Sequence, residues 1–89
     1  MTITKLSKTV FTPLEHGGGV LLNLNTLAYF KLNKTGAVIW EEIESADYPT
    51  VDSLAIKVSE RFDIGEKDAV DHILSFIARL EWFKLVSAS

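Results

Sequence analysis

The sequence predicts an α+β domain in which a three-stranded antiparallel sheet comes first and three helices follow. Up to about residue 32, short runs of β-branched, aromatic and aliphatic residues alternate with turn residues, which is typical of strands. From residue 34 onward, apolar residues recur at helical spacing instead, with breaks at Tyr48-Pro49 and at Asp63-Ile64-Gly65. Strands followed by helices indicate a fold in which the helices cover one face of a small sheet.

Three strands are expected, at about residues 8–13, 19–24 and 27–32. The first ends at Pro13, and His16-Gly17-Gly18-Gly19 forms the turn that follows, because glycine adopts positive φ at little cost. Asn25-Thr26 makes a second, tighter reversal. Since both connections are short, the strands should form an antiparallel meander.

Three helices are expected, at about residues 34–45, 50–62 and 66–82. Asn33 can cap the first and Thr50 the second, because both side chains accept hydrogen bonds from free backbone N–H groups. The third helix carries a stripe of apolar residues at helical spacing: Val70, Ile73, Ile77 and Leu80. Together with the sheet, these helices have the parts of a winged helix-turn-helix.

Length and composition favour one small domain spanning residues 1–89. Apolar residues make up 47% of the chain, and cysteine does not occur, which excludes disulfides and thiolate metal sites. No apolar run approaches the roughly 18 residues of a membrane span. The first residues lack the apolar segment of a signal peptide, so a cytoplasmic location is expected.

Charge is unevenly distributed along the chain. Residues 1–34 contain four lysines and one glutamate, a net charge of +3, whereas residues 35–89 contain five basic and eleven acidic residues, a net charge of −6. The third helix would be the recognition helix of a DNA-binding protein, but it carries only Lys67 and Arg79 against four carboxylates. Because phosphate binding needs clustered basic residues, nucleic acid is not expected as a partner. A winged-helix DNA-binding regulator is the alternative from another functional class.

Two histidine-containing motifs are better explained by a structural role than by a catalytic or metal-binding role. His16-Gly17-Gly18-Gly19 matches the letters of an esterase oxyanion motif, but the chain has no nucleophile elbow. Asp68, Asp71 and His72 share a helix face and can approach a metal ion. His16 is the only other histidine, however, and a catalytic metal site usually takes about three protein ligands.

The acidic cluster Glu41, Glu42 and Glu44 lies on the polar side of an amphipathic helix. Paired carboxylates act as general acids and bases only when a cleft shifts their pKa values. A solvated helix face does not provide such a cleft. The sequence therefore predicts no catalytic residue, no metal site and no cofactor.

The third predicted strand, residues 27–32, is the strongest candidate for a functional surface. In a three-stranded meander it is an edge strand with unpaired N–H and C=O groups, and Lys31 is its only charge. The third helix beside it has a wider apolar face than a small sheet covers. Its unused apolar residues lie on one of two flanks: Leu74, Ala78 and Trp82, or Phe76 and Phe83.

An open edge beside a partly apolar helix predicts a groove in which an extended peptide adds a further strand. The backbone of the edge strand would supply hydrogen bonds, and apolar pockets would hold alternate side chains of the peptide. The alternative is that the same edge pairs with a second copy of the chain, or that the N-terminus covers it.

Seven segments of the chain match one family in order and spacing: residues 19–24, 28–33, 36–40, 50–54, 62–64, 71–80 and 85–86. In these segments the chain resembles the PqqD-like proteins, the leader-peptide recognition domains of pathways that modify ribosomally made peptides. The resemblance covers nearly the whole chain from about residue 8. Trp82-Phe83-Lys84 stands where the family commonly has a glycine, which leaves the end of the third helix open.

The aromatic strand, followed by Leu32-Asn33-Lys34-Thr35-Gly36 and then Trp40, is most similar to the stand-alone proteins of lasso-peptide clusters. This resemblance implies a domain without catalytic activity that binds the leader of a precursor peptide by strand addition. The implied partners are that leader, a leader peptidase of the cysteine-protease type and an ATP-dependent macrolactam synthetase. The alternative within the family is the peptide chaperone of pyrroloquinoline quinone synthesis, which presents its precursor to a radical enzyme.

The resemblance also implies where the leader binds, because in the family it pairs with the third strand and lies against the third helix. Carried onto this chain, the strand residues are Leu27, Ala28, Tyr29, Phe30, Lys31 and Leu32. The helix residues are Asp71, Leu74, Ser75 and Ala78, with Phe76 as the contact if the helix is rotated the other way.

Overall fold

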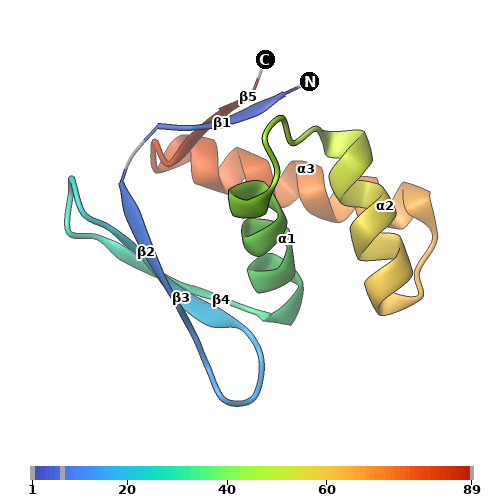
Figure 1. Cartoon of the computed structure of the whole chain (residues 1–89), viewed down its shortest axis with the longest axis horizontal. Coiled ribbons are helices and arrows are strands. Elements are labelled where there is room, and N and C mark those ends of the chain that lie inside the picture. The colour runs from blue at the N-terminus through green and yellow to red at the C-terminus, as the bar shows by residue number, and fades with distance from the viewer. Residues whose placement is uncertain (1, 7, 89) are drawn as a thin grey trace.

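The computed structural model describes residues 2–6 and 8–88 of the chain. In this part of the chain the elements are β1 (Ile3–Lys5), β2 (Thr9–Pro13), β3 (Gly19–Asn23), β4 (Tyr29–Leu32), α1 (Lys34–Ser45), α2 (Val51–Phe62), α3 (Glu66–Trp82) and β5 (Val86–Ala88). Strands β2, β3 and β4 form an antiparallel sheet, and the three helices lie on one side of it (Figure 1). The predicted α+β class, with a three-stranded antiparallel sheet followed by three helices, is confirmed.

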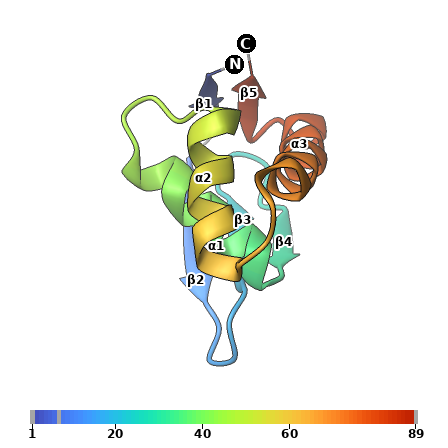
Figure 2. The ribbon, with the colours of Figure 1, turned by 90° about the vertical axis from the view of Figure 1, so that its right-hand side faces the viewer.

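The two ends of the chain form a second, two-stranded sheet that is absent from the sequence prediction. Strand β1 pairs antiparallel with β5, and Ile3 lies opposite Ala88. Figures 1 and 2 both show the two termini side by side at the same end of the molecule. Each strand has three residues, too few to show an alternating pattern, and their pairing depends on contacts across the whole chain.

Strand β4 begins two residues later than the predicted strand 27–32. Leu27 has a φ of 62°, and its N–H donates to the Asn23 carbonyl oxygen at 2.7 Å, so Leu27 belongs to the turn. The buried Asn23 side chain organises this turn, since its Oδ1 accepts a hydrogen bond from the backbone N–H of Asn25 at 2.9 Å. Leu27 and Ala28 therefore precede the strand instead of forming part of it.

Side chains of the three-stranded sheet alternate between its two faces. The inner face is turned toward the helices, and its central row is made of Phe11, Leu21 and Phe30, which lie opposite one another. The outer face is turned to solvent, and its two rows are Val10, Leu22 and Tyr29, and Thr12, Val20 and Lys31. None of these six outer side chains is fully buried.

The first two helices begin at the predicted capping residues. The Asn33 Oδ1 accepts a hydrogen bond from the Gly36 N–H at 2.8 Å, so α1 starts immediately after β4 with one residue between them. Thr50 and Ser53 form a capping box, with both hydrogen bonds at 3.0 Å. The chain thus passes from edge strand to helix without a flexible linker.

The hydrophobic core lies between the inner sheet face and the helices. Its largest fully buried side chains include Trp40 and Ile39 from α1, Ile73 and Ile77 from α3, and Leu21 from β3. Full burial of a side chain of this size stabilises a fold by about 1.5–3 kcal/mol. In the described residues, no helix has the length and apolar character needed to cross a membrane.

The β2–β3 turn depends on two glycines with positive φ, as the sequence predicts. Gly17 has a φ of 89° and Gly18 a φ of 78°. A Cβ on Gly18 would also overlap the Leu32 carbonyl oxygen. The turn therefore packs closely against the end of β4.

Replacing Gly18 with alanine should destabilise the fold by about 2 kcal/mol or more, because backbone strain at positive φ adds to the overlap with Leu32. Thermal unfolding followed by circular dichroism should show a melting temperature lower by roughly 8–16 °C. Gly65→Ala is the control, since Gly65 has a φ of −65° and nothing lies within 4 Å of an added Cβ. Equal losses in the two variants would contradict this account.

Candidate functional site

The outer edge of β4 is open. This strand pairs with β3 on one side only, and among the described residues no backbone hydrogen bond joins its other side to a further segment. The Asn23 N–H donates to the Ala28 carbonyl oxygen at 2.8 Å, which sets the alternation of the antiparallel ladder. By that alternation Phe30 directs its backbone groups toward β3, whereas Tyr29 and Lys31 direct theirs to the open edge. An added strand can therefore pair with these two residues.

A cavity of about 320 Å³ lies beside this open edge, where β4 ends and α3 passes. Figure 2 shows β4 and α3 on the same side of the molecule. Three segments line the cavity: Lys31, Leu32 and Asn33 at the end of β4, Thr35, Gly36 and Ile39 from α1, and His72, Ser75, Phe76 and Arg79 from α3. We call this cavity, together with the outer edge of β4, the β4–α3 groove.

The floor of the β4–α3 groove is apolar. Leu32, Ile39 and Phe76 are buried side chains that line it. Phe76 sits on the start of α1, where a Cβ added to Gly36 would lie 3.2 Å from the Phe76 Cε1 atom. The absence of a side chain at Gly36 thus lets α3 approach α1 and leaves Phe76 at the bottom of the groove.

An aromatic pair extends this apolar floor along β4. The rings of Phe30 and Phe83 lie with their centroids 4.4 Å apart and their planes at 47°. Phe30, Phe83 and Phe76 also share a smaller recess with Leu32 and Leu80. This pair therefore joins the middle of the edge strand to the end of α3.

The rim of the groove is cationic. Lys31 from β4 and His72 and Arg79 from α3 line it, and all three residues are exposed. Among the described lining residues no aspartate or glutamate occurs. The groove therefore suits an extended peptide that offers apolar side chains to the floor and carboxylates to the rim.

The structure brings some of the predicted site residues together. Tyr29 and Lys31 are exposed with their backbone groups at the open edge, and Phe30 is half-buried. On the floor and walls of the cavity are Leu32, Ser75 and Phe76.

Other predicted site residues lie outside the cavity. Leu27 and Ala28 lie in the turn before β4 and are exposed. Asp71, Leu74 and Ala78 are exposed on α3 and do not line the cavity. Helical spacing places Asp71, Ser75 and Ala78 on one stripe, so Asp71 and Ala78 lie on the flank next to the cavity.

Several lining residues are missing from the sequence prediction. From α1 they are Thr35, Gly36 and Ile39, and from α3 they are His72 and Arg79. A signal for the α3 residues exists, because His72, Phe76, Arg79 and Phe83 recur at helical spacing and form a second stripe. Which of the two stripes faces β4 depends on the rotation of α3 in the packed fold, and local sequence does not determine that rotation.

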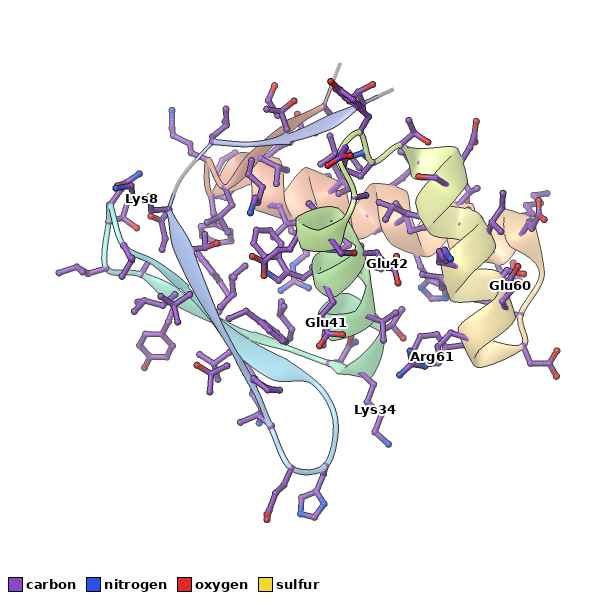
Figure 3. The ribbon with its side chains drawn as sticks, in the orientation of Figure 1. Lys8, Lys34, Glu41, Glu42, Glu60 and Arg61 are labelled. Atoms are coloured by element: carbon purple, nitrogen blue, oxygen red, sulfur yellow. The ribbon has the colours of Figure 1, made fainter. Side chains whose placement is uncertain are left out.

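The other clusters considered from sequence lie away from the groove. Among the described residues, no group of three or more histidine, cysteine, aspartate or glutamate side chains is placed to hold a metal ion. Glu44 forms an ion pair with Lys5 at 3.5 Å. A separate hollow of about 340 Å³ lies between the β2–β3 turn, α1 and α2, and Lys34, Glu41 and Arg61 line it (Figure 3).

A family model for coenzyme PQQ synthesis protein D (PqqD) matches residues 18–85, which is well over half of the 89-residue chain. The chain belongs to the PqqD family. The resemblance to PqqD-like proteins is therefore confirmed. Comparison of this PqqD-family chain with curated protein sequences gives no match.

Two solved structures have the same fold as this PqqD-family chain. The first, TbiB1 in complex with the TbiA(beta) leader peptide, has a TM-score of 0.81 and 21% sequence identity, and the likeness covers 96% of each chain. The second, lasso peptide synthetase B1 complexed with the leader peptide, has a TM-score of 0.77 and 17% identity, over 97% of this chain and 98% of the other. At these identities the likeness shows the fold.

Replacing Phe83 with alanine should destabilise the fold by about 1–3 kcal/mol, because the Phe30 ring loses both its aromatic partner and part of its cover. Urea unfolding followed by circular dichroism would measure the change. Trp82→Ala is the matched control: Trp82 is 80% exposed, against 43% for Phe83, so its removal should change stability by less than about 0.5 kcal/mol. A larger loss for Trp82→Ala than for Phe83→Ala would contradict the arrangement described for the groove.

Proposed function

We propose that this PqqD-family chain binds the leader of a ribosomally made precursor peptide and presents it to processing enzymes. The observation that carries the proposal is the open edge of β4 beside a lined cavity. An exposed strand edge promotes aggregation unless another segment covers it or a ligand binds to it. Family membership and the fold shared with two leader-bound proteins support use of the edge for a peptide.

The leader would add to the sheet as a fourth strand. The N–H and C=O groups of Tyr29 and Lys31 would supply its main-chain hydrogen bonds and set its register. Alternate side chains of the leader would then point into the groove toward Leu32 and Phe76. Main-chain pairing makes such binding tolerant of leader sequence, whereas the apolar floor selects a few anchor residues.

Helix α3 would form the outer wall for the bound peptide. Ser75 lines the cavity and belongs to the exposed stripe that also contains Asp71 and Ala78. These three residues would lie along the leader, and Leu74 would lie at the far margin of the same flank. Leu27 and Ala28 would contact the end of the leader that reaches the turn before β4.

The chain would act as an adaptor without catalytic activity. The proposed recipients of the leader-bound precursor are a leader peptidase of the cysteine-protease type and an ATP-dependent macrolactam synthetase, as in lasso-peptide synthesis. One domain would bind the leader while other proteins modify the core. The core sequence could therefore vary without affecting recognition. The second candidate, favoured by the PqqD family match, is a chaperone that presents the precursor of pyrroloquinoline quinone.

A backbone amide NMR titration tests the proposal, with a synthetic leader peptide from the precursor gene that neighbours the gene of this chain. We expect shifts concentrated on β4 and on residues 71–83, saturating with a Kd of about 1 µM. A peptide copied from a pyrroloquinoline quinone precursor is the comparison, and tighter binding of that peptide would favour the chaperone. Absence of shifts on β4 with the cognate leader would overturn the proposed function.

Replacing Tyr29 with proline should lower leader affinity about tenfold, because the outward N–H that would pair with the leader is lost. The fold should survive, since Tyr29 is the first residue of an edge strand, and its N–H is not needed by β3. Isothermal titration calorimetry with the leader would measure the change. Tyr29→Ala is the matched control, because it removes the same side chain and keeps the N–H. Equal losses in the two variants would mean that the leader does not pair with this edge.

A further inference from the structure

The β4–α3 groove is basic in a chain that is acidic as a whole. The sequence contains twelve aspartate and glutamate residues against nine lysine and arginine residues, which gives a net charge of −3. The cavity of the groove is nevertheless lined by Lys31, His72 and Arg79, and no described lining residue carries a carboxylate. Helix α3 shows the same separation, because its four carboxylates lie outside the cavity while Arg79 lines it. Positive charge is thus collected at the place where peptide binding is proposed.

The hollow between the β2–β3 turn, α1 and α2 provides a comparison within the same molecule. Its volume is about 340 Å³, close to the 320 Å³ of the groove cavity. There Lys34 and Arg61 share the lining with Glu41, so a carboxylate accompanies the two cations. In the described part of the chain, Lys31 and Arg79 have no carboxylate in their cavity and take part in no ion pair. Two unbalanced cations at one cavity favour an anionic ligand.

The other polar groups of the lining do not neutralise these cations. Asn33 has the only side-chain carbonyl oxygen among the lining residues, and this Oδ1 already accepts a hydrogen bond from the Gly36 N–H at 2.8 Å. Thr35 and Ser75 contribute uncharged hydroxyl groups, which can donate to an oxygen atom of a ligand. A carboxylate of the ligand would therefore be the only group of opposite charge in the cavity.

Arg79 joins the apolar and the charged parts of the groove. It lines the cavity together with Phe76, and it also lines the smaller recess that Phe30 and Phe83 share. Because Arg79 is exposed, its methylene stem can cover apolar surface while its guanidinium stays in water. A guanidinium binds a carboxylate through two parallel N–H···O hydrogen bonds. Lys31 borders the same cavity from β4 and adds to the positive potential there.

We infer that Arg79, assisted by Lys31, holds an aspartate or glutamate side chain of the leader. This inference rests on the proposed function, since the ligand is the leader paired with β4. Alternate side chains of an added strand point to the same face, so the carboxylate and the apolar anchor above Phe76 would be two positions apart. Arg79 follows Phe76 by roughly one helical turn, about 5 Å, and two strand residues advance by about 7 Å. The flexible arginine side chain spans the difference.

Such a subsite would make the groove selective for acidic leaders. The apolar floor accepts any aliphatic or aromatic anchor of suitable size, so it distinguishes poorly between peptides. A carboxylate at the second position would pair with the guanidinium, whereas a lysine or arginine there would be repelled by two like charges. The apolar floor would thus supply affinity, and the charged subsite would supply much of the specificity.

The test combines variants of the chain with variants of the cognate leader, the peptide from the neighbouring precursor gene. Arg79→Gln removes the charge and keeps a polar side chain. Arg61→Gln is the matched control, because it removes the same residue type from an exposed position on α2 outside the cavity. In the leader, each aspartate and glutamate of the segment that pairs with β4 is changed singly to asparagine or glutamine. Isothermal titration calorimetry measures every combination.

We expect Arg79→Gln to weaken leader binding about fivefold, as for an ion pair at an exposed site, and Arg61→Gln to match the wild type. One amide variant of the leader should bind the wild type about fivefold more weakly. The same variant should bind Arg79→Gln as tightly as the unaltered leader does, because the interaction is already lost. Raising salt from about 0.05 to 0.5 M should weaken binding by the wild type more than binding by Arg79→Gln.

Three results would overturn the inference: a cognate leader without a carboxylate in the paired segment, equal losses in Arg79→Gln and Arg61→Gln, or no leader carboxylate coupled to Arg79. In all three the wild type still binds the leader, so the proposed function stands. Failure of the wild type to bind the leader at all removes both, which the first titration reveals. Lys31→Gln replaces Arg79→Gln if that variant does not fold, and unchanged leader affinity in Lys31→Gln would then overturn the inference.

Discussion

The contact between Phe76 of α3 and Gly36 at the start of α1 determines the shape of the candidate site. Because Gly36 has no side chain, the Phe76 ring reaches the first turn of α1. Asn33 fixes that turn directly after β4 through its bond to the Gly36 N–H at 2.8 Å. Strand edge, helix start and α3 are thereby held at one place. As a result, α3 forms one wall of a groove along β4, and the outer edge of the strand has no backbone partner among the described residues.

The open edge of β4 lacks the usual protection against pairing with other chains. Many proteins protect such an edge with proline, charges or a covering segment. Here Lys31 is the only charge in β4, and the aromatic pair Phe30–Phe83 packs the inner side of the strand against the end of α3. A strand that is already held by such packing loses less conformational entropy when a peptide pairs with it. An edge that stays open beside an apolar floor and a cationic rim is thus suited to bind a peptide, whichever precursor supplies it.

The sequence alone predicts the α+β class and β4 as an edge strand, because alternation, helical spacing and capping residues are local signals. Asn33 and Thr50 are examples, since each begins a helix where its side chain can cap one. Three features need the packed structure. Pairing of β1 with β5 joins opposite ends of the chain. The place of Leu27 in a turn depends on the buried Asn23. The stripe of α3 that faces β4 depends on how α3 packs against the rest of the fold, where Phe76 lies close to Gly36.

The alternation of β4 separates the proposed peptide-binding edge from the side chains of the outer sheet face. In an extended strand, residues that direct their backbone groups to one side also direct their side chains to one face. Tyr29 and Lys31 therefore direct N–H and C=O groups to the open edge and side chains to the outer face. Phe30 and Leu32 pair with β3 and direct their side chains to the core and the groove. A strand of four residues thus has separate roles for its odd and even positions.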